Sequence, residues 1–153
     1  MTFQILSKAF ENGGKIPDLY TCKGKNISPP LMWEDPPSGV KSFAIIMEDL
    51  DIPFGTITHW VLYNIPAKNR ELLEHIPHHD SLPDGALQGK NGMRKTGYMG
   101  PCPPFGIHRY KFTLYAVDTV LGINSKMNKK RLLKEIEDHI LAQAHLVAYY
   151  SKK

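Results

Sequence analysis

The sequence predicts a mostly β domain, arranged like a sandwich, with one peripheral helix. Several short segments alternate between apolar and polar residues, or are almost wholly apolar, as strands are. Turns rich in glycine and proline separate these segments, and the chain contains 12 residues of each type. Only one stretch, late in the chain, has helical spacing. With 153 residues, the whole chain (1–153) has the length of a single domain.

The first strand signals lie near the N-terminus. Residues 2–6 alternate as a strand does. Residues 16–21 also resemble a strand, although Pro17 restricts them to a sheet edge or an irregular segment. Leu31 and Trp33 are two positions apart, so we expect them to share one buried face.

Three segments in the middle of the chain are predicted to be the central strands. Residues 42–48 form a nearly continuous apolar run, which indicates a strand buried on both faces. Residues 49–55 are expected to be a loop, and residues 59–65 the next strand. Residues 110–117 alternate and form the third strand.

The remaining segments are less regular. Residues 66–106 are rich in glycine and proline, which predicts a functional loop or a segment with unrecognised short strands. Residues 129–142 have an apolar stripe at helical spacing, and Ser125 or Asn128 is a suitable N-cap. Residues 146–150 are expected to close the sheet as an edge strand.

Composition limits the function classes. The net charge of +4 indicates a mild attraction to anions. No basic stripe is interleaved with aromatic residues, so we expect no nucleic-acid partner. The chain has no apolar run of transmembrane length and no signal-like start, so we expect no transmembrane segment and a cytoplasmic location. In a reducing cytosol, Cys22 and Cys102 are expected to be free thiols.

Ionisable side chains gather at the ends of the three central strands. Asp49 and Asp51 follow the first, His59 opens the second, and His108 and Tyr110 open the third. Because side chains alternate along a strand, the last two point the same way and the arginine between them points the other way. If the three strands are neighbours, these groups line one small polar pocket.

Such a pocket is suited to an anion. Imidazoles and the N–H groups of glycine-rich loops donate hydrogen bonds to anions. A nearby carboxylate is expected to raise the pKa of both histidines and keep their rings charged. The pattern therefore favours a site for phosphate, sulfate, carboxylate or a phosphoryl headgroup, with no cofactor and no metal.

Other interpretations stay open. The two histidines and two aspartates of the pocket could bind a metal, although no pair among these four has i,i+3 or i,i+4 spacing. The tract His78-His79-Asp80 could also bind a metal or form an exposed turn. Cys102 could act as a nucleophile beside His108, although no G-x-S-x-G elbow exists for a serine. Isolated histidines and loop aspartates are also common as structural residues.

Four blocks of sequence occur together in the order of one known family. They are Asn-Ile-Ser-Pro-Pro-Leu-x-Trp at 26–33, Asp-x-Asp-x-Pro at 49–53, His-Trp-Val-Leu-Tyr-Asn-Ile-Pro at 59–66, and Gly-Tyr-x-Gly-Pro-Cys-Pro-Pro-x-Gly-x-His-Arg-Tyr at 97–110. Together they resemble the phosphatidylethanolamine-binding protein family, and more closely its prokaryotic branch of Raf kinase inhibitor-like proteins. The resemblance covers almost the whole chain.

The resemblance implies a large antiparallel sheet packed on a smaller sheet, with peripheral short helices. It also implies an anion pocket at the mouth of the large sheet, with Gly100 offering backbone near the anion. Arg109 is then a structural ion-pair partner. The matching pocket residues are Asp49, His59, Gly100, Pro101, His108 and Tyr110.

The chain departs from the family pattern at one loop. The usual Asp-Pro-Asp-Ala-Pro has Leu50 and Ile52 in place of proline and alanine, so the loop is expected to be looser and bulkier. The bond between Ile52 and Pro53 is the candidate for a cis peptide. The C-terminal region is short, as in the prokaryotic branch, which is expected to leave the pocket mouth open.

The implied function is a non-catalytic binding protein for phospholipid headgroups or nucleotide phosphates. One alternative is a protein inhibitor of a serine protease or kinase, acting through the segment 68–97. A second alternative is an unrecognised hydrolase. The prokaryotic branch also suggests a homodimer.

Overall fold

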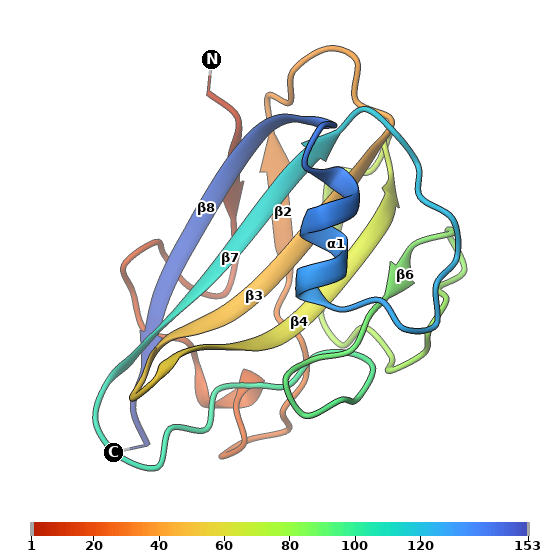
Figure 1. Ribbon diagram of the computed structural model, residues 1–153. Helices are drawn as coiled ribbons and strands as arrows, with labels where there is room; N and C mark the ends of the chain where they lie inside the picture. Colours follow the sequence, from red (N-terminus) through yellow and green to blue (C-terminus); the bar gives the residue numbers. More distant parts are fainter. Residues whose placement is uncertain (1, 153) are drawn as a thin grey trace.

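Five antiparallel strands form the large sheet of this computed structural model, which describes residues 2–152 (Figure 1). In spatial order they are β6 (Leu87–Gln88), β4 (Gly55–Pro66), β3 (Ser42–Ile52), β7 (His108–Val117) and β8 (Ile140–Tyr150). Strand β3 pairs with β4 on one side and with β7 on the other. The three strands predicted to be central are therefore neighbours.

A smaller sheet packs on one face of the large sheet. Its antiparallel strands are β1 (Gln4–Leu6), β2 (Leu31–Glu34) and β5 (Glu71–Leu72). Leu31 and Trp33 are buried between the sheets, as their spacing predicted. The two-sheet arrangement confirms the predicted fold class.

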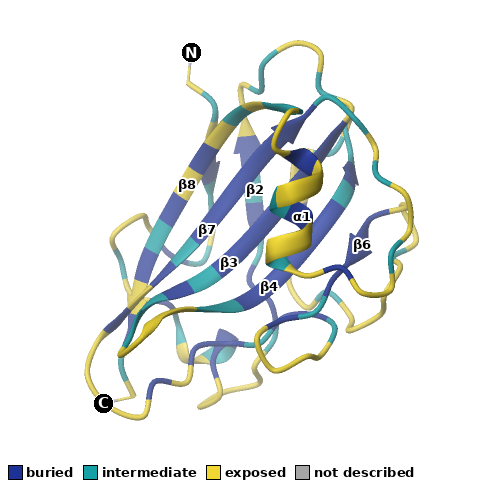
Figure 2. Ribbon diagram, viewed as in Figure 1, coloured by how far each residue is buried: buried dark blue, intermediate teal, exposed yellow. Residues whose placement is uncertain are grey.

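The helix α1 (Lys129–Ile136) lies over the opposite face of the large sheet, as Figures 1 and 2 show. Its buried residues Leu132 and Ile136 join a second apolar cluster with side chains of β3, β4 and β7. The Asn128 side chain caps the helix by accepting the Arg131 N–H at 2.9 Å. Strand β3 is covered on both faces, which explains its continuous apolar run.

The C-terminal part differs from the prediction. The helix ends at Ile136 rather than at residue 142, and β8 begins at Ile140 rather than at residue 146. Strand β8 pairs with β7 along its whole length. Tertiary pairing has therefore overridden the helical spacing of residues 140–142.

Two local predictions near the N-terminal half are wrong. Residues 49–55 were expected to be a loop, but β3 continues to Ile52 because its neighbours pair with it that far. Residues 16–21 form the irregular segment that Pro17 allowed, and they contain the short 3-10 helix η1 (Asp18–Tyr20). The peptide bond between Ile52 and Pro53 is trans, since no described peptide bond is cis.

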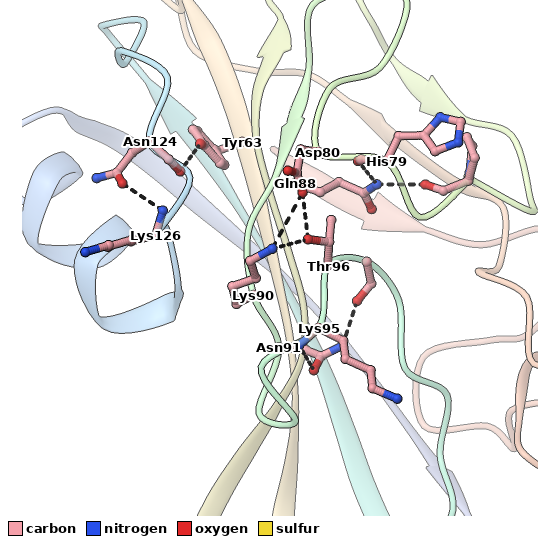
Figure 3. A network of polar contacts seen from close by, with 12 residues as sticks. Tyr63, His79, Asp80, Gln88, Lys90, Asn91, Lys95, Thr96, Asn124 and Lys126 are labelled. Carbon is pink, nitrogen blue, oxygen red and sulfur yellow. Dashed lines mark hydrogen bonds and ion pairs between the residues drawn. The ribbon is translucent and has the colours of Figure 1, made fainter.

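Side-chain hydrogen bonds order the long segment between β4 and β7 (Figure 3). Lys90 Nζ donates to Thr96 Oγ1 at 2.6 Å, and Thr96 Oγ1 donates to Asp80 Oδ1 at 2.7 Å. Gln88 Nε2 donates to the His79 carbonyl at 2.8 Å. The segment holds the two short strands β5 and β6, which confirms the prediction of unrecognised short strands in residues 66–106.

Cys22 and Cys102 form a disulfide, so the prediction of free thiols is wrong. The bond joins the segment before β2 to the proline-rich loop before β7. Disulfides persist mainly in oxidising compartments, with intracellular proteins of hyperthermophiles as an exception. A cytoplasmic location therefore stays a prediction. In residues 2–152, no helix has the length and apolar character needed to cross a membrane.

Reduction of this disulfide is expected to lower the free energy of unfolding by about 2–4 kcal/mol, because the bond closes a long loop in the unfolded chain. Denaturant unfolding with and without dithiothreitol measures the loss. The double variant Cys22→Ser/Cys102→Ser is the control and should not respond to the reductant. A wild-type midpoint that dithiothreitol leaves in place contradicts this expectation.

Candidate functional site

The register of the large sheet brings three of the predicted site residues together. Asp49 on β3 lies opposite Tyr110 on β7 and opposite Ile57 on β4. His108 precedes Tyr110 by two residues and therefore shares its face. These side chains meet on the face of the sheet that carries the main core, at the end where β3 leads into β4.

A β-bulge brings the fourth residue, His59, into the site. Two consecutive residues of β3 pair with Trp60 and Thr58, which leaves His59 as an additional residue of β4. The His59 carbonyl accepts the N–H of Met99 at 2.9 Å, so it pairs with the loop rather than with β3. A bulge changes the direction of a side chain, and here it accompanies the turn of His59 toward the loop before β7.

These residues line a cavity of about 240 Å³. Of the six predicted pocket residues, Pro101 alone is absent from its lining. Pro101 is buried instead, and its carbonyl accepts the N–H of Cys22 at 3.1 Å. The lining residues are Asp49, Ile52, Ile57, His59, Met99, Gly100, Cys102, Pro103, Pro104, His108 and Tyr110.

Hydrogen bonds fix the orientation of both histidine rings. His59 Nδ1 lies 2.5 Å from the Met99 carbonyl oxygen, and His108 Nδ1 lies 2.7 Å from Asp49 Oδ2. The Met99 carbonyl oxygen can only accept a hydrogen bond, and the same is true of an ionised Asp49 carboxylate. Each Nδ1 therefore carries the proton of its hydrogen bond. Within residues 2–152, neither Nε2 has a hydrogen bond, and both rings line the cavity.

The expectation that both rings are charged is wrong for His59. Its side chain is buried, and burial lowers the pKa of the ring more than the Met99 hydrogen bond and the Asp49 carboxylate raise it. His59 is therefore a neutral ring at neutral pH. With a proton on Nδ1, its Nε2 is then an acceptor.

The Tyr110 hydroxyl is buried at the cavity and has no hydrogen bond of acceptable geometry within the described residues. Its ring lies between the rings of His59 and His108, with centroid distances of 5.3 and 6.5 Å. Burial, then the charge of Asp49 and the approach of its carboxylate to the hydroxyl, raise the pKa of the phenol, so it stays protonated. A buried O–H without a partner costs free energy that a bound acceptor would recover.

Gly100 lines the cavity but does not have the expected role. Its N–H donates to Asn26 Oδ1 at 2.9 Å and so is already occupied. A Cβ at this position would lie 2.2 Å from Asn26 Oδ1 and 2.4 Å from the Tyr20 carbonyl oxygen. Glycine therefore allows the loop to pack closely against the segment around Asn26.

Arg109 is the structural ion-pair partner that the resemblance implied. Its guanidinium donates to both carboxylate oxygens of Asp51, at 2.8 and 2.9 Å, and its backbone N–H donates to the same carboxylate. These bonds lower the pKa of Asp51 to about 2. The pair links the end of β3 to the start of β7 beside the cavity.

Sequence reasoning missed part of the lining. Ile57 lies two positions before His59, so strand alternation was a signal that could have found it. Met99 comes from the irregular loop, whose path no periodicity predicts. Ile52 was noted only as a bulky departure from the family pattern.

The comparison with known proteins agrees with this architecture. The sequence matches the family described as phosphatidylethanolamine-binding protein over residues 6–151. The chain is a member of this family. A UPF0098 protein of the archaeon Methanothermobacter thermautotrophicus is 47% identical over 148 residues, which cover 97% of this chain and 98% of that protein.

Two solved structures of phosphatidylethanolamine-binding protein homologues have the same fold. CT736 of Chlamydia trachomatis has a TM-score of 0.92 and 38% identity, and the match covers 99% of each chain. YbcL of Escherichia coli has a TM-score of 0.91 and 31% identity over 100% of each chain. Membership of this family supports a binding type of function, and none of these relatives has the name of an enzyme.

Tyr110→Phe is expected to leave the free energy of unfolding unchanged or to raise it, because the deleted hydroxyl has no partner. Tyr98→Phe is the matched control, since the buried Tyr98 hydroxyl donates to the Tyr20 carbonyl at 2.7 Å. That control should lose about 1 kcal/mol. Denaturant unfolding of both variants checks the contrast, and an equal loss in Tyr110→Phe would show that its hydroxyl is structural.

Proposed function

We propose that the cavity binds a phosphate-sized anion, in particular the phosphoryl group of a larger molecule. The observation that carries this proposal is the convergence of three unpaired polar atoms. His59 Nε2, His108 Nε2 and the Tyr110 hydroxyl belong to residues that line one cavity, and none has a hydrogen bond within the described residues. Tyrosine and protonated histidine are donors suited to phosphate oxygens.

Proton uptake is part of the proposed binding. A neutral His59 ring offers its Nε2 as an acceptor, which repels an anion oxygen. The anion either brings a proton, as a phosphate monoester can, or the ring gains one on binding. In both cases, at high pH, the complex of protein and anion holds one more proton than the free protein and the free anion together. The affinity for the anion therefore falls as pH rises.

The size of the cavity supports a phosphoryl group rather than a whole lipid. About 240 Å³ is below the usual range of pockets that enclose a drug-sized ligand. The name of the matched family, phosphatidylethanolamine-binding protein, agrees with a phosphoryl headgroup as the bound part.

The alternatives receive less support from the site. Cys102 is held in the disulfide, so it provides no thiolate nucleophile for a hydrolase. Among residues 2–152, no His, Cys, Asp and Glu side chains cluster as metal ligands. Inhibition of a protease or kinase stays a prediction from the resemblance. Inhibition that survives a pocket substitution would assign it to the segment 68–97. A homodimer also stays a prediction.

His108→Ala is expected to weaken phosphate binding about tenfold or more, because it removes one of the three polar groups of the cavity and leaves Asp49 without its partner. His139→Ala is the matched control, since His139 Nδ1 lies 2.8 Å from Asp118 Oδ1 outside the cavity. Isothermal titration with inorganic phosphate measures both variants. In the wild type, affinity should also fall between about pH 5 and pH 8.

Two results would reject the proposal. One is equal phosphate affinity in the wild type and in His108→Ala, with His139→Ala unchanged. The other is a wild-type affinity that stays constant across this pH range, because the account requires proton uptake when the anion binds beside His59.

A further inference from the structure

Two segments that carry basic residues and no acid lie side by side at the start of α1. Residues 89–97 contain three lysines or arginines, and residues 126–134 contain five. We call these the basic segments. The N–H of Lys90 donates to the Met127 carbonyl at 2.7 Å, so a backbone hydrogen bond joins the two. Figure 3 shows them close to each other, with Lys90 and Lys126 labelled.

The basic segments hold the whole positive excess of the chain. The sequence has 19 lysine and arginine residues and 15 acidic residues. Eight of the 19 lie in the basic segments, so the other 11 are outnumbered by the acids. Charge of one sign that is gathered on one surface steers an oppositely charged partner toward that surface.

Most of these eight side chains have no acidic neighbour. Three form ion pairs, which are Lys90 with Asp80, Lys129 with Glu48 and Lys134 with Glu137. Within residues 2–152 the other five form none, and they are Arg94, Lys95, Lys126, Lys130 and Arg131. All five are exposed, so their charges are available to a partner.

The first turn of α1 places cations where a helix disfavours them. It holds Lys129, Lys130 and Arg131 and no acid. The N-terminal end of a helix carries a partial positive charge, so cations there lower the stability of the helix. Glu48 compensates Lys129 alone. Residues that oppose the local rule for stability are expected at functional sites, and contact with an anionic partner explains these.

Two adjoining pockets lie along the basic segments. One has a volume of about 690 Å³ and is lined by α1 and the residues before it, with Glu135 as the acid in its lining. The other, of about 270 Å³, lies between the start of α1, residues 90–92 and Thr58 of β4. Asn128 and Lys130 line both pockets. We call the two pockets together the basic groove.

The basic groove is separate from the anion cavity. Neighbouring residues of β4 alternate between them, since Thr58 lines the groove while Ile57 and His59 line the cavity. No residue lines both. A ligand of the groove is therefore independent of the function proposed for the cavity.

We propose that the basic groove binds an extended acidic segment of a partner protein. Charge complementarity supports an acidic partner, and exposed apolar side chains beside the groove support a protein. Met93 follows Gly92 of the groove and is 61% exposed, and Ile123 precedes Asn124 of the groove and is 86% exposed. A peptide with apolar side chains among its acids contacts both kinds of group.

A protein segment fits this surface better than a nucleic acid does. Proteins that bind single strands stack the bases on aromatic side chains. Residues 89–97 and 119–134 contain no phenylalanine, tyrosine or tryptophan. Nucleic acid is nevertheless an alternative occupant that the test must distinguish.

The test is fluorescence anisotropy of the full chain with a fluorescein-labelled peptide in which leucines are interspersed among glutamates. The wild type should bind this glutamate–leucine peptide, and added salt should weaken the binding. A peptide with serine in place of leucine should bind more weakly, because Met93 and Ile123 lose their apolar contacts. Equal affinity for the two peptides would overturn the protein partner.

Lys130→Glu/Arg131→Glu should weaken binding of the glutamate–leucine peptide at least about tenfold, because two cations of the groove become anions. Both substitutions place acids in the first turn of α1, where the helix favours them. The midpoint of denaturant unfolding should therefore stay the same or rise, which separates a binding loss from a folding loss.

The matched control is Lys8→Glu/Lys68→Glu, which makes the same change in net charge at two exposed lysines outside the basic segments. It should bind the peptide as the wild type does. Both double variants should have the same affinity for inorganic phosphate, since none of the four residues lines the anion cavity.

The remaining outcomes overturn the proposal. Equal losses of peptide affinity in the two double variants would show that the attraction follows net charge alone. A wild type that binds phosphate but not the glutamate–leucine peptide overturns the groove as a docking site and leaves the proposed function intact. Tighter binding of a single-stranded DNA oligonucleotide than of the peptide, lost in Lys130→Glu/Arg131→Glu, assigns the groove to a nucleic acid.

Discussion

The buried hydrogen bond between His108 and Asp49 is the interaction on which the candidate site depends. It joins the two central strands β3 and β7 at the cavity, and it occupies the Nδ1 atom of His108. The remaining nitrogen is thereby left for the cavity. Burial and then the Asp49 charge raise the pKa of Tyr110, so the phenol keeps its proton. One carboxylate therefore orients an imidazole and lies in the same cavity lining as the phenol.

The proline-rich loop before β7 forms the other side of the cavity, opposite His108 and Asp49, and contacts from elsewhere in the chain hold it in place. The proline-rich loop is tied to the segment before β2 through the disulfide and through the bond from Gly100 to Asn26. Met99 of the same loop fixes the ring of His59. Because these ties already order the loop, an anion would bind without the entropy cost of closing it.

Sequence patterns predicted the parts of this structure that depend on local periodicity. The apolar run of residues 42–48 and the alternation of 110–117 identified the central strands, and the resemblance supplied the pairing of two sheets. The bulge at His59 and the disulfide of Cys22 depend on contacts distant in the sequence, so no local pattern indicated them. The neutral state of His59 follows from burial, which only the packed structure reveals.

The central claim is that the cavity is completed by an anion and a proton. The most direct measurement is ¹⁵N NMR of the histidine ring nitrogens at neutral pH, with and without inorganic phosphate. The account predicts that Nε2 of His59 is unprotonated in the free protein. When phosphate is added, this nitrogen either gains a proton and donates a hydrogen bond to the anion, or accepts a hydrogen bond from a protonated phosphate oxygen. Resonances of His59 and His108 that do not change at saturating phosphate would contradict it.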